Sequence, residues 1–413
     1  MSDGRTVGRL DCTIALWCLC TLVFVSRSDG QTVRPSDVYR ARAVAILKTV
    51  PLIDGHNDIP DAIRERGGLD SVNFATNQPK LMSDIPRLRR GAVGAQFWAA
   101  YVPVTTMDSG THPAVYALEQ IDLVHRLCSK NASLAIAYTA ADVERNFGAG
   151  KISCMIGIEG GHAIENSLGA LRMFSRLGVR YITLTHWRSL DWAVASTDTS
   201  HRGLSAFGKQ VVLEMNRLGM LVDLSHVNDQ TMSDALHTSR APIIFSHSSA
   251  RALTNHARDV PDSILKLVAA NRGVVMVNFN PGFVSEAVRA WGDSVTARVA
   301  RLRAAGADSA ARADSLRVWE AAAPHATLAQ VADHIEHIRQ VAGIDCVGLG
   351  SDFDGITEVP VGLEDVSKFP DLIAELLRRG WTAADVKQVA GQNTLRVLRE
   401  AERVALDMRR THR

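Results

Sequence analysis

Histidine and carboxylate side chains recur at the ends of short apolar segments in this chain of 413 residues. Six such segments end in polar groups: Asp54-Gly-His56-Asn-Asp58, Glu159-Gly-Gly-His162, Thr185-His186, Asp223-Leu-Ser-His226, Ser246-His247 and Asp352-Phe-Asp354. Burying an ionisable group is costly unless it has a partner. One histidine at the end of an apolar segment is usually structural, but six such endings together indicate a shared partner. A metal centre is the simplest candidate.

The pair His56 and Asp58 is the sharpest local signal. Alternate residues of an extended segment point the same way, so both side chains can bind one ion. The alternative is that Asp58 or Asn57 caps the helix that follows. Histidine and carboxylate donors without paired thiolates favour Zn²⁺, with Mn²⁺ and Co²⁺ as alternatives. Glu159 has two oxygens and could bridge two ions, an arrangement that hydrolases use.

The elements that must position these residues alternate along the chain between apolar strand-like runs and amphipathic helices. The runs are short and rich in Ile, Val and Leu, as buried parallel strands are. We expect strands at Val50–Asp54, Ala92–Val102, Cys154–Glu159, Val179–His186, Met220–His226, Pro242–His247, Gly273–Phe279 and Cys346–Asp352. We expect helices at Leu168–Leu177, Ala206–Leu218, Asp262–Ala270, Asp371–Arg379 and Ala383–Leu406, several of them followed by Gly.

Eight strands alternating with helices predict an α/β fold, a (β/α)₈ TIM-type barrel. An open, doubly wound sheet is the alternative. The barrel is favoured because it brings the carboxyl ends of all its strands to one face, where the polar endings would meet.

One segment before the last strand interrupts this alternation. Residues 285–323 are rich in Ala, Arg and Asp, with helical spacing of their Val, Leu and Ala. They predict an extra helical insertion. Two interpretations of this insertion remain. It is either a solvated pair of surface helices or part of a lid or a subunit contact.

The first thirty residues differ from the rest of the chain. Arg5 and Arg9 precede an apolar run from Cys12 to Val25, which is typical of a secretory signal. An uncleaved membrane anchor is the alternative. We therefore divide the chain into residues 1–30, a signal peptide or N-terminal anchor, and residues 31–413, a single metal-dependent barrel domain. The predicted location is exported: periplasmic, secreted or held at a membrane by the N-terminal segment.

Charge and cysteine content set further limits. The formal net charge of +2 gives no reason to expect nucleic acid as a partner. Beyond residue 30 the chain contains only Cys128, Cys154 and Cys346. This odd, sparse set predicts no disulfide framework.

The polar endings, taken together, resemble those of a known family. The likeness runs from about Val44 to Leu406. It rests on Ile53-Asp-Gly-His-Asn-Asp58, Gly157-Ile-Glu-Gly-Gly-His162, Leu221-Val-Asp-Leu-Ser-His226, Ser246-His-Ser-Ser-Ala-Arg251, Arg258-Asp-Val-Pro-Asp262, Gly348-Leu-Gly-Ser-Asp-Phe-Asp-Gly355 and Gly362-Leu-Glu-Asp-Val-Ser-Lys368. The chain resembles the membrane (renal) dipeptidases of the amidohydrolase superfamily.

This resemblance implies a role for each matching residue. The metal ligands of two Zn²⁺ ions per chain would be His56, Asp58, Glu159, His226 and His247, with Glu159 bridging. The catalytic and substrate-binding residues would be His186 near the oxyanion, Arg258 on the substrate carboxylate and Asp352 as acid and base. Asp354 is the alternative to Asp352, and Arg258 could instead pair with Asp259 or Asp262. The resemblance also implies a homodimer.

The implied function is zinc-dependent hydrolysis of dipeptides, including L-Xaa-D-Xaa, by a hydroxide that bridges the two metals. Another amidohydrolase activity on the same barrel, such as cyclic amide or lactone hydrolysis, is one alternative. A catalytically inactive binding barrel is the other. The segment Trp187–Trp192 differs from the sequence that is usual in the animal enzymes of this family. The resemblance therefore does not indicate which side chains of the substrate are preferred.

Overall fold

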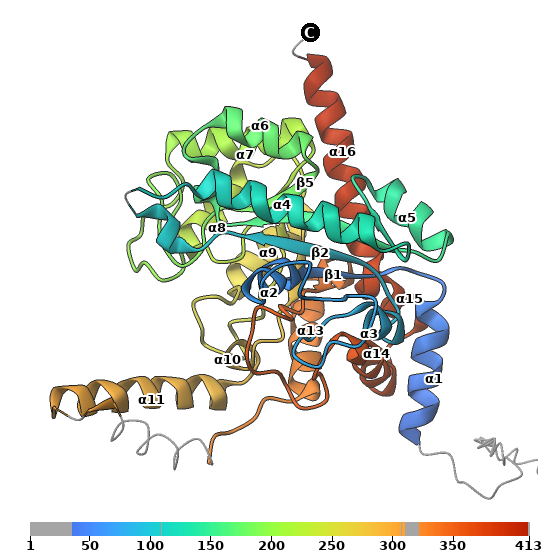
Figure 1. Ribbon diagram of the computed structural model, residues 1–413. Helices are drawn as coiled ribbons and strands as arrows, with labels where there is room; N and C mark the ends of the chain where they lie inside the picture. Colours follow the sequence, from blue (N-terminus) through green and yellow to red (C-terminus); the bar gives the residue numbers. More distant parts are fainter. Residues whose placement is uncertain (1–34, 109, 307, 310–321, 412–413) are drawn as a thin grey trace, which may run out of the picture.

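The computed structural model describes residues 35–411 except 109, 307 and 310–321. A closed barrel of parallel strands lies at its centre, and helices surround it (Figure 1). The strands are β1 (Leu52–Asn57), β2 (Val93–Tyr101), β3 (Leu134–Ile136), β4 (Ile152–Glu159), β5 (Val179–Thr183), β6 (Leu221–Asp223), β7 (Ile244–Phe245), β8 (Val274–Val277) and β9 (Val347–Leu349). The order β2-β1-β9-β8-β7-β6-β5-β4 closes through pairing of β2 with β4. This confirms the predicted (β/α)₈ barrel.

Strand β3 is an addition that the sequence did not predict. It pairs in parallel with Ile152–Cys154 at the start of β4, whereas β5 pairs with the end of β4, from Ile156 onward. It has only three residues. Such a short run gives too little periodicity to identify a strand without its neighbour.

The helices cover the outside of the barrel (Figure 1). They are α1 (Pro35–Leu47), α2 (Ile59–Glu65), α3 (Ile85–Arg90), α4 (Pro113–Lys130), α5 (Ala140–Gly148), α6 (Leu168–Arg176), α7 (Ala206–Leu218), α8 (Asp229–Thr238), α9 (Asp262–Asn271), α10 (Pro281–Val284), α11 (Glu286–Ala304), α13 (Leu328–Ala342), α14 (Phe369–Arg378), α15 (Ala383–Lys387) and α16 (Asn393–Thr411). Helix α7 has the predicted bounds, and α6, α9 and α14 differ from prediction by one or two residues at their ends.

The predicted helix Ala383–Leu406 is interrupted. A π-helical turn over Gln388–Gln392 separates α15 from α16. There Gly391 lies against the backbone that leads into β1, and an added Cβ would be 2.1 Å from the carbonyl oxygen of Pro51. Asn393 then donates to the carbonyls of Ile344 and Val347. The π-helical turn therefore lets α15 and α16 pack closely against the barrel. The local hydrophobic periodicity of the sequence does not predict such a tertiary contact.

The predicted insertion contains a long helix, α11, which projects from the body of the molecule (Figure 1). None of its residues is fully buried. The end of the predicted insertion falls partly on residues outside the described part of the chain.

The sequence predicted no disulfide framework, but the structure contains one disulfide among its described residues. Cys128, near the end of α4, is bonded to Cys154 in β4. The two residues are 26 positions apart in sequence, and they meet because α4 packs on β4. The third cysteine, Cys346, is buried and unpaired.

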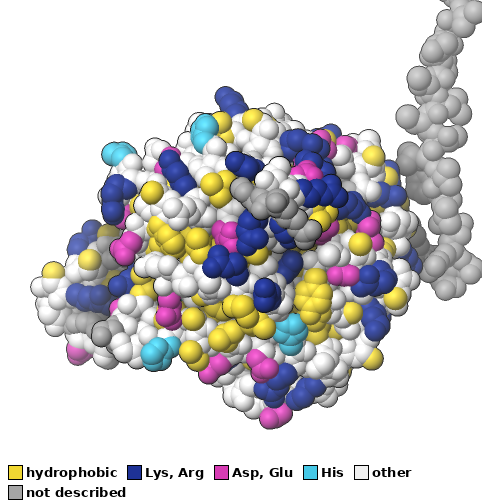
Figure 2. All heavy atoms as spheres, turned by 90° about the horizontal axis from the view of Figure 1, so that it is seen from above, with side chains coloured by type: hydrophobic (Ala, Val, Ile, Leu, Met, Phe, Trp, Pro, Cys, Tyr) yellow, Lys and Arg dark blue, Asp and Glu magenta, His cyan; other side chains and the backbone are white. Residues whose placement is uncertain are grey.

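The surface is mixed in character. Figure 2 shows basic side chains interspersed with acidic and hydrophobic ones on one face of the molecule. Among the described helices, none has both the length and the apolar character needed to cross a bilayer. The predicted signal or anchor, residues 1–30, lies outside the described residues.

Candidate metal centre and substrate cavity

The carboxyl ends of four strands bring five of the predicted site residues together. His56 and Asp58 belong to the end of β1 and the residue after it, and Glu159 ends β4. His226 and His247 follow β6 and β7. All five are buried, with exposed fractions of 6% or less. The barrel has therefore placed donors from distant parts of the sequence at one face, as its topology requires.

Glu159 lies at the centre of this cluster. Its Oε1 is 3.1 Å from His226 Nε2 and 3.3 Å from His247 Nε2. Its Oε2 is 3.6 Å from His56 Nε2, which is 3.2 Å from Asp58 Oδ2. One carboxylate oxygen thus faces the β6 and β7 histidines while the other faces the β1 pair. This is the arrangement that a carboxylate bridging two ions requires.

The hydrogen bonds behind His247 fix which of its ring nitrogens carries a proton. The hydroxyl of Ser246 donates to Asp223 Oδ2 over 2.7 Å, so it must accept at its contact with His247 Nδ1, also 2.7 Å. Asp223 is fixed in turn by Thr183 and by the backbone of Ser246. The proton is therefore on Nδ1, and the lone pair of Nε2 points into the cluster, as in histidines that bind metals.

His56 is supported in a similar way from inside the barrel. Its Nδ1 is 2.8 Å from the hydroxyl of Tyr181. The ring of Tyr181 lies directly on Gly157, where an added Cβ would be 2.0 Å from the ring. Gly157 therefore makes room for Tyr181 to reach across to His56. With Nδ1 hydrogen-bonded to Tyr181, Nε2 is left facing the carboxylates.

The charges of the cluster favour a cation. Burial alone would raise the pKa of Glu159, but the surrounding histidines together lower it well below its usual range. Burial lowers the pKa of His226 and His247 so that both rings are neutral. Burial also raises the pKa of Asp58 to about 8. His56 differs from these two histidines: although burial opposes it, the negative charges of Asp58 and Glu159 raise its pKa well above the usual value. The buried carboxylates therefore attract positive charge, which a proton on His56 or a bound metal ion can supply.

Zinc fits this donor set. Nε2 of His56 is buried and has no hydrogen-bond partner. Nε2 of His226 and Nε2 of His247 are only 3.0 Å apart, although both rings are neutral. Three-residue groups with ligand atoms within 4.8 Å of one another occur on both sides of Glu159: His56, Asp58 and Glu159 on one side, and Glu159, His186 and His226 on the other. Imidazole and carboxylate donors without thiolate are those of catalytic zinc sites.

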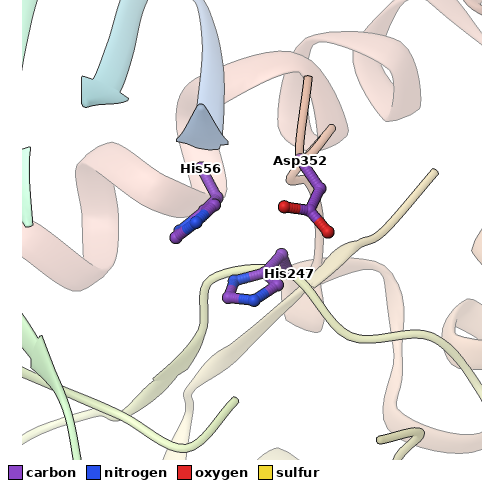
Figure 3. A group of neighbouring side chains, drawn as sticks. All are labelled: His56, His247 and Asp352. Carbon is purple, nitrogen blue, oxygen red and sulfur yellow. The ribbon is translucent and has the colours of Figure 1, made fainter. Parts of the chain in front are cut away.

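Asp352 joins the cluster from the loop after β9. Figure 3 shows its carboxylate facing His56 and His247, and ligand atoms of these three residues lie within 4.8 Å of one another. Its Oδ2 accepts a hydrogen bond from Asn278 over 3.0 Å. Its near neighbour Asp354 instead accepts from the backbone of Met82. The structure therefore brings Asp352, rather than Asp354, to the histidines.

The backbone at the site is held in unusual conformations. Asp352 has φ 65° and His226 has φ 68°, in the left-handed region that residues other than glycine seldom adopt. Such strain persists only where surrounding contacts impose it, and it concentrates at functional sites. Gly355 is constrained in another way, because an added Cβ would be 2.1 Å from Asp58 Oδ2.

A cavity of about 370 Å³ opens above the cluster. His186, which follows β5, lines this cavity, and its Nε2 is 3.9 Å from Glu159 Oε1. Burial lowers the pKa of His186 to about 4, so the ring is neutral at pH 7. Its Nδ1 is buried and has no hydrogen-bond partner.

Arg258 also lines the cavity, with only 1% of its surface exposed. It donates to Ser248 Oγ and to the carbonyl of His247, and not to Asp259 or Asp262. Its Nε is buried without a partner. Its guanidinium lies near the rings of Trp187 and Phe283. A buried cation with a free donor, facing a cavity, is suited to bind a carboxylate.

Several residues at the site were missed by the sequence analysis. Asp223 and Ser246 were named only as polar strand endings, and Tyr181 and Asn278 not at all, because all four gain their supporting roles only through tertiary contacts. The cavity wall also includes Tyr101, Asn280, Phe283, Asp61 and Glu65. The last two had a detectable signal, because they lie three and seven residues after Asp58 on a helix.

Comparison with known proteins agrees with this geometry. A model of the membrane dipeptidase family, peptidase family M19, matches residues 40–412. Dipeptidase 3 of Mus musculus is 40% identical over 373 residues, which cover 88% of this chain and 67% of that protein. Dipeptidase 3 of Homo sapiens is 39% identical over 378 residues, covering 90% and 69%.

Two solved structures have the fold of this chain. A probable dipeptidase from Pseudomonas aeruginosa has the same fold, with a TM-score of 0.77 at 23% identity, over 89% of this chain and 99% of that one. A metallo peptidase from Rhodobacter sphaeroides has a TM-score of 0.68 at 27% identity, over 85% and 99%. The latter was solved with a phosphinate mimic of the dipeptide L-Ala-D-Ala.

A parallel barrel with histidines and carboxylates gathered at its strand ends defines a metal-dependent hydrolase. The chain belongs to the membrane dipeptidase family, peptidase family M19. It is a metallo-dipeptidase, a hydrolase of peptide bonds. This membership favours dipeptide hydrolysis over the cyclic amide or lactone alternative.

Proposed function

We propose that this protein hydrolyses dipeptides, including L-Xaa-D-Xaa, with two Zn²⁺ ions held by His56, Asp58, Glu159, His226 and His247. The observation that carries the proposal is the position of Glu159, whose two oxygens face two separate histidine groups. When bound, two such ions polarise a scissile carbonyl and lower the pKa of a water molecule to about 7.

Asp352 acts as the proton carrier. Its Oδ2 is held by Asn278, which leaves Oδ1 to accept the proton of the attacking water. The same carboxyl then delivers that proton to the leaving amine of the peptide bond. No covalent bond to the protein is needed.

His186 stabilises the oxyanion that forms at the scissile carbonyl. Because burial keeps its ring neutral, one ring nitrogen carries a proton that it can donate. A donor fixed at the place where negative charge develops is worth roughly 3–4 kcal/mol in comparable sites.

Arg258 determines the length of the substrate. It binds the C-terminal carboxylate with its guanidinium fork, a geometry that lysine does not reproduce. A carboxylate fixed one residue beyond the scissile bond selects dipeptides over longer chains. The dipeptide mimic bound to the Rhodobacter sphaeroides relative supports a D-residue in the second position.

Export and self-association are inferred on separate grounds. The basic and apolar residues 1–30 support export. The Cys128–Cys154 bond supports it too, since disulfides persist in oxidising compartments. A homodimer remains a prediction from the family resemblance alone.

The test is a kinetic panel of L-Ala-L-Ala, L-Ala-D-Ala and the tripeptide L-Ala-L-Ala-L-Ala. We expect both dipeptides to be cleaved and the tripeptide to be resistant. Dialysis against a chelator should abolish activity, and two equivalents of Zn²⁺ should restore it, with Mn²⁺ and Co²⁺ as comparison metals. A protein that binds zinc but cleaves no dipeptide would support the inactive binding barrel instead.

A further inference from the structure

The wall of the cavity beside Asp58 is formed by one face of helix α2. Asp58, Asp61, Ala62 and Glu65 all line the cavity. Their spacing of three, four and seven residues places them on a single helical face. Three of these four residues carry carboxylates. This wall of the cavity is therefore acidic from the proposed metal ligand Asp58 to Glu65.

The carboxylates beyond Asp58 are available to a ligand. Asp61 is half-buried, and its Oδ1 accepts from Tyr116 and Gln120. Its Oδ2 has no hydrogen bond or ion pair with any described residue. Glu65 is exposed and likewise has no ion pair within the described part of the chain.

The nearest basic residue does not neutralise this wall. Arg64 donates to Glu119 over 2.6 Å, and its guanidinium lies over the ring of Tyr116. Burial, followed by the negative charge of Glu65, raises the pKa of Asp61, and the positive charge of Arg64 does not reverse this direction. The wall therefore keeps a net negative character.

The acidic wall lies across the cavity from Arg258. Helix α2 follows β1, whereas Arg258 follows β7, and β9 and β8 separate these strands around the barrel. The same cavity is lined by His186 and Arg258, two buried side chains that each keep one nitrogen without a hydrogen-bond partner. A dipeptide whose carboxylate is bound by Arg258 would direct its N-terminal residue toward α2.

The spacing along α2 indicates which part of that residue the wall meets. At 1.5 Å per residue, Asp61 lies roughly 4–5 Å and Glu65 roughly 10 Å along the helix axis from Asp58. The α-ammonium group lies next to the scissile carbonyl, near the metal cluster, and does not reach that far. A lysine or arginine side chain, with its charge on a long stem, does.

We propose that Asp61 and Glu65 form a subsite that selects dipeptides with Lys or Arg as the N-terminal residue. This inference rests on the proposed dipeptide hydrolysis and adds the class of substrate. Charge-assisted hydrogen bonds from ammonium or guanidinium to the two carboxylates would supply the selectivity.

The test compares L-Lys-L-Ala with L-norleucine-L-Ala, which has the same stem without the charge. In the full-length, zinc-loaded enzyme we expect kcat/KM to be about tenfold or more higher for L-Lys-L-Ala. In the double variant D61N/E65Q this ratio should fall to within about twofold of unity, through a loss of kcat/KM for L-Lys-L-Ala. The single variant E65Q, at an exposed position, should give an intermediate ratio.

The control is Asp122→Asn, an exposed carboxylate on α4 that does not line the cavity, which should leave the ratio as in the wild type. Equal kcat/KM for the two dipeptides in the wild type would overturn the subsite but not the dipeptidase. The same holds if the double variant loses activity on both dipeptides equally. Failure to cleave either dipeptide would overturn the proposed function and the subsite together.

Discussion

The cluster of proposed metal ligands and helix α11 lie near the same end of the barrel, but they differ in how firmly their side chains are held. His247 is 1% exposed, and both of its ring nitrogens have neighbours within about one hydrogen-bond length. Helix α11 has no fully buried residue over its 19 positions. The site residues thus lie where several strands and hydrogen bonds determine the position of each side chain, whereas α11 adds only the partly buried Val288 to the core.

The largest effect is expected from Glu159→Gln. This change removes one negative charge from the centre of the cluster and should weaken both proposed metal positions at once. If the two proposed ions supply several kcal/mol of transition-state stabilisation, kcat/KM for L-Ala-L-Ala should fall by about a thousandfold or more. The measurement is steady-state kinetics together with zinc content by atomic absorption.

The matched control is Glu144→Gln, at an exposed residue of α5. It should retain full activity and zinc. A Glu159→Gln protein with two zinc ions and more than a tenth of wild-type activity would show that the bridging role is wrong.

A smaller effect is expected from Ser246→Ala, which leaves every proposed ligand in place. It removes the hydroxyl that connects Asp223 to His247 Nδ1. Loss of such a supporting hydrogen bond typically weakens metal affinity by about 10–100-fold. Competition with a chromophoric chelator measures the zinc Kd.

Ser249→Ala, a neighbouring buried hydroxyl that donates to the carbonyl of Asn278, serves as the comparison. It should leave the zinc Kd within about twofold. If Ser246→Ala did the same, the hydrogen bond to His247 would have no part in holding the metal.

A further prediction concerns stability away from the metal. His334 in α13 accepts a hydrogen bond from the backbone of Ala250, and burial lowers its pKa to about 4. Between pH 6.5 and 4 the unfolded chain binds this proton and the folded one does not. The free energy of unfolding should therefore fall as pH falls through this range, by roughly 3 kcal/mol from this residue.

The variant His334→Gln isolates that contribution, because its amide oxygen can accept the same hydrogen bond but does not titrate. The variant should lose less stability than the wild type between pH 6.5 and 4 in urea titrations. Parallel pH profiles for the two proteins would exclude His334 as a source of the dependence.

The smallest effect is expected from Ala297→Pro in the middle of α11. Proline disrupts a helix interior at a cost of about 3 kcal/mol, but only locally. Because α11 buries no residue, Tm of the barrel should shift by no more than a few degrees, and kcat/KM should stay within about twofold. A large loss of activity would instead indicate that α11 acts as a lid over the cavity.

The sequence allowed the fold and the cluster to be predicted for one reason. A parallel barrel places every strand end at one face, so polar residues that end the strands must meet, whatever their separation along the chain. His56, Glu159, His226 and His247 could be named on that basis. Asp61 and Glu65 were equally visible on α2, but nothing in the sequence identified that helix face as a cavity wall.

From the sequence alone, therefore, the eight strands of the barrel, its closure and the five proposed metal ligands at its mouth could be predicted. The tertiary structure alone decided the Cys128–Cys154 bond, the added strand β3, the choice of Asp352 over Asp354 beside the histidines, and the contacts of Ser246 and Tyr181 with their ring nitrogens. Each of these depends on two segments meeting at a particular distance and angle. Periodicity and spacing describe one segment at a time, so they fix which residues face the core but not which of them touch.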